Sequence, residues 1–167
     1  PGEQAWPTQP FPTRPAPFAR QGFTAADVID FTPALESAAL AEIAPFRQGP
    51  MYTPPSVQGT LALPGVIGGA NWGGAAVDPT TGWLYVKATN SPAMFKLNKR
   101  DAPSDTVDAA YQVDLARSSL GVTLRGANGE TIGGRLPVIK PPYGTLTAID
   151  MNSGETMWHL PLGDTPE

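Results

Sequence analysis

The segment TAIDMNSGETMW, residues 147–158, sets a polar turn between two runs of apolar and β-branched side chains. Asp150 and Gly154 bracket the turn, and the same D-x-x-x-G spacing recurs in DPTTGWLYV, residues 78–86. Glycine supplies the positive φ angle that closes such a turn, while the aspartate side chain can accept hydrogen bonds from the backbone amides of the turn. Both copies therefore predict antiparallel strands joined by tight turns, with Asp78 and Asp150 as turn formers.

Short runs of the same kind, each bounded by Gly, Pro, Asn or Asp, continue on both sides of these turns. The two turns lie farther apart than the roughly 40 to 50 residues of a propeller blade, so a repeat would need an insertion within 98–140. The expected fold class is mainly β, built from antiparallel sheets. Strands are predicted at 59–65, 74–78, 83–89, 144–151 and 155–162, with weaker ones near 122–125 and 136–139.

The N-terminal region differs from this β body. Prolines recur throughout residues 1–22, where they remove backbone donors and favour extended geometry. Interspersed aromatic residues, beginning with Trp6, predict an arm that lies on a protein surface. A short helix near 25–30, opened by a capping box of Thr24 and Asp27, and a longer one at 33–44 are expected to follow. The longer helix carries an apolar stripe of Leu35, Ala39 and Ile43.

Composition excludes several classes of protein. The chain has 167 residues, 41% of them hydrophobic, with 20 Pro and 18 Gly, which is too apolar for a disordered chain and typical of many short elements joined by turns. The 11 Lys and Arg are scattered over a chain of net charge -4, so nucleic acid is not expected as a partner. There is no Cys and His159 is the only His, which excludes Cys-ligated and multi-His metal sites and argues against a Ser-His-Asp triad.

Several motifs resemble one protein family in the same order. Residues 147–158 are similar to the tryptophan-docking repeat of eight-bladed quinoprotein dehydrogenases, in which a tryptophan leaving a glycine turn packs between neighbouring blades. Residues 49–90, GPMYTPPSVQGTLALPGVIGGANWGGAAVDPTTGWLYVKATN, resemble pyrroloquinoline quinone (PQQ)-dependent glucose dehydrogenases and their relatives. The arm and the stretch PPYGTLTAIDMNSGETMWHLPLG resemble the same family. The resemblance implies a partial β-propeller, about one blade plus part of the next, from the C-terminal half of the ring.

The resemblance also implies a chemistry. Members of this family hold PQQ on the propeller axis with a calcium ion, an aspartate acts as base, and hydride passes from the substrate to a quinone carbonyl. The resemblance places Asn90 at the quinone and matches an Asn-Trp pair to Asn71 and Trp72, with Trp72 lining the cofactor cavity. The base and the calcium ligands belong to blades N-terminal to this region, so no catalytic or metal-binding residue is expected in this chain. The isolated chain is expected to be inactive and to bind neither PQQ nor Ca²⁺.

Each candidate residue also has a structural interpretation. Trp72 could cover the end of a blade core, and Asn90 could be an ordinary turn residue. Asn71 could cap the following turn, which is its preferred role, and it stands where membrane-bound glucose enzymes tend to carry an acidic residue. Trp158 is expected to be a packing residue. Lys87 alternates with apolar neighbours, as on the solvated face of a strand, or it could reach a cofactor carboxylate if its strand faces the axis.

Four regions are expected along the chain. They are a Pro-rich arm with short helices at 1–48, a propeller blade segment with the cofactor-wall motif at 49–97, an insertion or loop region at 98–140, and the start of the next blade at 141–167. A closed propeller hides its strand edges, whereas a piece of one exposes them. Edge-strand self-association of the isolated chain is therefore expected.

The expected function is that of a fragment of a PQQ-dependent sugar or alcohol dehydrogenase. The parent enzyme would take a small-molecule sugar or alcohol as substrate and pass electrons to a quinone or cytochrome. It would be exported to the periplasm, with any membrane association made through a part outside this chain. Two alternatives stay open, a non-catalytic β-propeller scaffold or assembly protein and a short protein with a binding role of its own. Asn90 and the 49–90 match favour the dehydrogenase, whereas the turn repeat alone favours neither.

Overall fold

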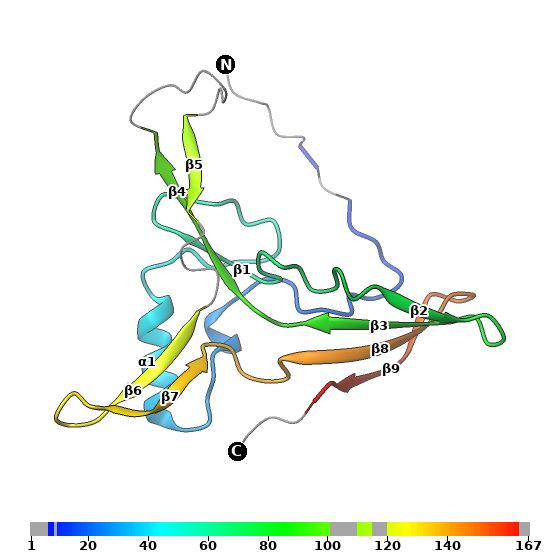
Figure 1. Ribbon diagram of the computed structural model, residues 1–167. Coiled ribbons are helices and arrows are strands. Elements are labelled where there is room, and N and C mark those ends of the chain that lie inside the picture. Colours follow the sequence, from blue (N-terminus) through cyan, green and yellow to red (C-terminus); the bar gives the residue numbers. More distant parts are fainter. Residues whose placement is uncertain (1–6, 9, 101–109, 115–119, 164–167) are drawn as a thin grey trace.

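The computed structural model describes residues 7–8, 10–100, 110–114 and 120–163 (Figure 1). Trp6 and parts of the 98–140 region lie outside these residues. The strands form antiparallel sheets of four, three and two strands, which confirms the expected mainly β fold class. The elements are a 3-10 helix (Ala25–Asp27), α1 (Pro33–Ile43), β1 (Thr60–Ala62), β2 (Ala75–Asp78), β3 (Trp83–Thr89), β4 (Ala93–Lys99), β5 (Tyr111–Asp114), β6 (Gly121–Arg125), β7 (Thr131–Pro137), β8 (Gly144–Asp150) and β9 (Glu155–Pro161).

The largest sheet has the strand order β2-β3-β8-β9. β3 pairs with β8 along its whole length, beginning with Trp83 opposite Asp150. Both aspartate turns, which join β2 to β3 and β8 to β9, therefore lie at the same end of one sheet (Figure 1). This differs from the expected division, which put 49–97 and 141–167 in successive blades. The reason is that β8 finds its partner in β3 across a long insertion, and no local pattern marks that pairing.

The described parts of 90–143 form an excursion between β3 and β8. Within it β4 pairs with β1 on one side and β5 on the other, and β6 and β7 form a hairpin with a bulge between Val122 and Leu124. The hairpin corresponds to the weak strands expected near 122–125 and 136–139. β4 was not predicted, because its AMFKLNK sequence mixes charged and apolar residues and its partners are distant in the chain.

Helix α1 anchors the main hydrophobic core. The Thr32 hydroxyl oxygen accepts a hydrogen bond from the Leu35 backbone N–H at 3.2 Å, and Pro33 occupies the first helical turn, as the sequence predicts. The predicted apolar stripe of the helix is buried, and it belongs to one cluster with Phe23, Val138 and Ile139. This cluster joins the arm, the helix and the β6–β7 hairpin, so it fixes the chain that leads into β8.

The arm ends in a 3-10 turn, which is shorter than the helix predicted at 25–30 but carries the expected capping box of Thr24 and Asp27. Farther out, the Phe11 ring contacts the Tyr52 ring with centroids 5.3 Å apart, and the Arg14 guanidinium pairs with the Glu155 carboxylate at 2.8 Å. The described part of the arm thus lies on the surface of the β body. Among the described residues, no helix is both long and apolar enough to cross a lipid bilayer.

Candidate functional site

The four-stranded sheet has two chemically different ends. The turn end holds the two aspartate turns, and the loop end consists of residues 65–74, 89–92 and 139–144, where β2 begins, β3 ends and β8 begins. The Thr89 backbone N–H donates to the Gly69 carbonyl at 2.7 Å, which ties the first two segments together. The structure therefore brings the predicted residues Asn71, Trp72 and Asn90 to the same end of one sheet.

Trp72 is the most exposed large apolar side chain of the loop end. It follows Asn71 in the glycine-rich loop before β2 and is 97% exposed. Tryptophan is usually well buried, so an indole presented this openly indicates a surface that is covered when a ligand or another part of the protein is present. Among the described residues Trp72 does not cover the end of a blade core.

Asn71 stabilises the loop that carries Trp72. Its side-chain amide donates to the Ile67 carbonyl at 2.9 Å, and its own carbonyl accepts from the Gly74 backbone N–H at 3.0 Å. The side chain thus closes the loop toward the preceding residues rather than capping the turn that follows. Gly74 has a φ angle of 60°, a conformation that side chains with a Cβ rarely adopt.

Asn90 has a different environment, because it is only 4% exposed. Its side-chain amide donates to the Pro142 carbonyl at 2.8 Å, and its side-chain oxygen accepts from the Arg20 backbone N–H at 3.3 Å. Its own backbone N–H donates to the Tyr143 carbonyl at 2.8 Å. Asn90 therefore joins the arm, the end of β3 and the segment that enters β8.

Arg20 completes this junction and was missed by sequence reasoning. Its guanidinium donates to the Lys140 carbonyl at 3.0 Å and to the Pro141 carbonyl at 2.8 Å. Hydrogen bonds from a charged donor are stronger than neutral ones. The partners are 120 and 121 positions away in the chain, so no local pattern around Arg20 could have revealed them.

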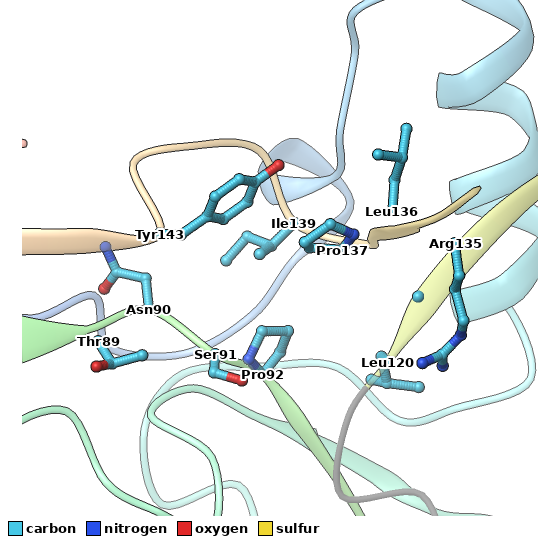
Figure 2. A pocket seen from close by; sticks show the side chains of 11 residues that line it. Thr89, Asn90, Ser91, Pro92, Leu120, Arg135, Leu136, Pro137, Ile139 and Tyr143 are labelled. Atoms are coloured by element: carbon cyan, nitrogen blue, oxygen red, sulfur yellow. The ribbon is translucent and has the colours of Figure 1, made fainter. Parts of the chain in front are cut away.

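A cavity of about 330 Å³ opens beside Asn90. Figure 2 shows Asn90 and Tyr143 on one side of it and Leu120 and Arg135 on the other. Burial raises the pKa of the Tyr143 hydroxyl, which keeps this group protonated and able to donate a hydrogen bond. The cavity can accept a small molecule with an apolar body and a few polar groups, whereas Asn71 and Trp72 do not line it.

The turn end confirms the predicted roles of its aspartates. One carboxylate oxygen of Asp78 accepts from the Thr80 backbone N–H and the other from the Thr81 hydroxyl, both at 2.9 Å, and Asp150 makes the two equivalent bonds at the same distance. Backbone hydrogen bonds, followed by the hydroxyl bonds, hold the pKa of both aspartates below the ordinary value of 3.8. These carboxylates are structural, because the turns use their oxygens.

Aromatic packing supports the same sheet. The Trp158 ring on β9 packs against Tyr85 on β3 with centroids 5.8 Å apart, and Tyr85 in turn contacts Trp83 at 6.5 Å. Trp158 is thus a packing residue, as expected. The Nδ1 atom of His159 shares a hydrogen bond of 2.7 Å with the Thr147 hydroxyl across the β8–β9 pair. This bond gives His159 a structural role in the sheet.

The residues that could hold a cofactor gather at the loop end. Within the described ranges, no three His, Cys, Asp or Glu side chains cluster as metal ligands. The loops 65–74, 89–92 and 139–144 contain no acidic residue, and the Asp30 carboxylate that reaches the loop end pairs with Lys140 at 3.4 Å, so the loop end does not repel an anionic ligand. A planar anionic cofactor such as PQQ fits the exposed indole face of Trp72 and this absence of acidic groups.

Comparison with known proteins identifies the family of the chain. The PQQ family model described as the glucose/ethanol/alcohol dehydrogenase β-propeller domain matches residues 1–167. The quinate/shikimate dehydrogenase (quinone) of Acinetobacter baylyi is 31% identical over 170 residues, and the quinoprotein glucose dehydrogenase of Escherichia coli is 29% identical over 178 residues. The glycerol dehydrogenase large subunit of Gluconobacter oxydans is 26% identical over 179 residues.

These matches cover 98%, 99% and 98% of this chain, respectively, but only 21%, 21% and 24% of the relatives. The chain thus spans about a fifth to a quarter of the length of the dehydrogenases it matches. The names of all three relatives are those of dehydrogenases, and the substrates in these names differ. The chain belongs to the PQQ-dependent glucose/ethanol/alcohol dehydrogenase family, and its antiparallel sheets form part of the β-propeller of that family.

Proposed function

We propose that this chain is part of a PQQ-dependent dehydrogenase that oxidises a sugar or alcohol. The observation that carries the proposal is the loop end, where the open indole of Trp72 and the cavity beside Asn90 lie at one end of a propeller sheet. PQQ, when bound, supplies the redox chemistry by accepting a hydride at a quinone carbonyl. The residues of this chain bind and orient it and exclude water from one side.

Three residues have separate roles in this proposal. Trp72 covers one side of the planar cofactor, and Asn71 holds the loop that presents the indole. Asn90 is the proposed contact to the quinone, and its junction with Arg20 keeps its amide in one orientation. The calcium ion and the base are proposed to be held by other parts of the full-length enzyme, and within the described residues no three His, Cys, Asp or Glu side chains cluster.

The remaining features of the full-length enzyme are also proposals. The isolated chain is expected to be inactive and to bind no PQQ, because it spans only about a fifth of relatives such as the one from Acinetobacter baylyi. Electrons would pass to a quinone or a cytochrome, and the enzyme would work in the periplasm. Quinate, glucose and glycerol are the first substrates to test, because they appear in the names of the relatives.

The test uses the full-length protein that contains this segment, reconstituted with PQQ and Ca²⁺. Dye reduction is measured with aldoses, polyols, quinate and primary alcohols, for the wild type and for Trp72→Ala and Asn90→Ala. Met151→Ala is the matched control, since Met151 is 58% exposed but lies in the turn at the opposite end of the sheet.

Turnover that requires PQQ and falls in the two loop-end variants while their circular dichroism spectra match the wild type, but does not fall in Met151→Ala, would support the proposal. A wild-type protein that binds no PQQ and oxidises none of these substrates would overturn it. The non-catalytic scaffold would then be the better description, with Trp72 and Asn90 in packing and turn roles.

A further inference from the structure

Lys87 is a charged residue next to the loop end that the proposed function leaves unused. It lies on β3 opposite Leu146 of β8 and is exposed. On the other side of β3, the pairing with β2 begins only at Val86 opposite Ala75. Lys87 therefore lies just beyond the last β2 pair, where the loop containing Trp72 crosses the edge of the sheet.

Gly73 shows where the ammonium group is held. A Cβ atom built on Gly73 would lie 2.8 Å from Lys87 Cε and 3.0 Å from Lys87 Nζ. The lysine side chain thus occupies the space that a side chain at position 73 would need. Because Gly73 directly follows Trp72, the charge of Lys87 lies beside the residue that presents the open indole.

The charge of Lys87 is not neutralised by its surroundings. Among the described residues no carboxylate pairs with Lys87, the loops 65–74, 89–92 and 139–144 contain no Asp or Glu, and the nearby Asp30 carboxylate pairs with Lys140. The acidic residues of this sheet, Asp78, Asp150 and Glu155, belong to its turn end. The negative charges of the sheet therefore gather at its turn end, and the positive charge of Lys87 beside the loop end favours an anion.

A planar hydrophobic face beside an ammonium group matches a ligand that has a ring and a carboxylate. We propose that Lys87 binds a carboxylate of the ligand held at the loop end, a role that rests on the proposed function. The carboxylate has two chemical sources, because PQQ carries carboxylates on a planar ring system and the substrate could be a hydroxylated carboxylic acid. Two independent measurements distinguish these sources.

The experiment uses the full-length protein with the variants Lys87→Met, Lys87→Arg and Gly73→Ala. Lys87→Met removes the charge, Lys87→Arg keeps it, and Gly73→Ala displaces the ammonium without removing it. Lys99→Met, an exposed lysine on β4, is the matched control. The first readout is the Kd of the apoprotein for PQQ by titration calorimetry, which does not depend on turnover.

The second readout is the KM of the holoenzyme, at saturating PQQ, for quinate as a carboxylated substrate and for glycerol as a neutral one. A charge-assisted contact at a partly exposed site corresponds to about a tenfold change in affinity. If the cofactor supplies the carboxylate, Lys87→Met raises the Kd for PQQ about tenfold and leaves both KM values unchanged. If the substrate supplies it, the Kd stays the same and only the KM for quinate rises about tenfold.

In either case Gly73→Ala gives a smaller effect in the same direction, and Lys87→Arg retains most of the affinity. A wild type that binds PQQ and turns over, with a Lys87→Met variant that equals Lys99→Met in both readouts, overturns the role of Lys87 while the proposed function stands. A wild type that neither binds PQQ nor turns over overturns both.

Discussion

Replacing Asn90 with alanine is the sharpest structural test of the loop end. The side chain is 4% exposed and makes two hydrogen bonds, to the Pro142 carbonyl at 2.8 Å and from the Arg20 backbone N–H at 3.3 Å. The variant leaves both partners without their bond in a partly buried junction. Each polar group stranded in this way costs about 1–3 kcal/mol. The longer of the two bonds is the weaker, so we expect the free energy of unfolding to fall by about 2–4 kcal/mol.

The assay is urea unfolding of the 167-residue chain, at a concentration where light scattering shows a monomer, followed by circular dichroism with the m-value checked for a two-state transition. Asn71→Ala is the matched control, because it removes the same chemical group from an exposed site with a single bond to the Ile67 carbonyl. Its cost should stay below about 1 kcal/mol. An Asn90→Ala variant no less stable than Asn71→Ala would refute the view that Asn90 holds the junction together.

Other predictions concern the core, the turns and the sheet edges. Ile43 is 1% exposed, so Ile43→Ala should lower the free energy of unfolding in urea by about 2–5 kcal/mol. Leu40→Ala, on the outer face of the same helix, should lower it by less than about 1 kcal/mol, and equal losses would contradict the placement of the core. Gly154→Ala should cost about 1–2 kcal/mol, because the φ angle there is 74°, and an unchanged midpoint would count against a strained turn. Folding lowers the pKa of Asp78 below 3.8. The contribution of Asp78 to stability is therefore present above pH 3.8 and is lost as the pH falls through the folded-state pKa. An NMR titration of the Asp78 carboxyl with a midpoint above 3.8 would disprove this. The edge strand β9 should make the isolated chain self-associate, and Leu160→Lys should weaken this in size-exclusion chromatography with light scattering; a wild-type monomer would refute it.

The local elements of the fold could be predicted from sequence because short-range chemistry specifies them. The Thr32 cap and Pro33 set the start of α1, and spacing of four residues set its buried stripe. The turn after Asp78 forms from bonds to residues two and three positions away, so its D-x-x-x-G pattern contains all the groups that it needs. Strand β3 was predicted with its bounds because turn residues delimit it on both sides.

The candidate site could be predicted only in part. Family resemblance pointed to Asn71, Trp72 and Asn90, and the structure brings them to one end of a sheet. The resemblance carried no information on their environments, which range from a fully open indole to a buried amide. Arg20 carries no local signal, because its partners are carbonyl groups, which every residue has.

Local residue patterns were enough to predict the turns, the helix and the family, since each of these depends on residues that are close in the chain or on an ordered series of motifs. Tertiary structure alone decided that β8 joins β3 in one sheet rather than starting another. It also decided that Arg20 bonds to the segment before β8 and that Lys87 lies against Gly73. These contacts form when segments separated by many residues pack together. They use backbone carbonyls, which every residue has, and the space beside a glycine that lacks a Cβ atom, so the sequence around them carries no signal of the contact.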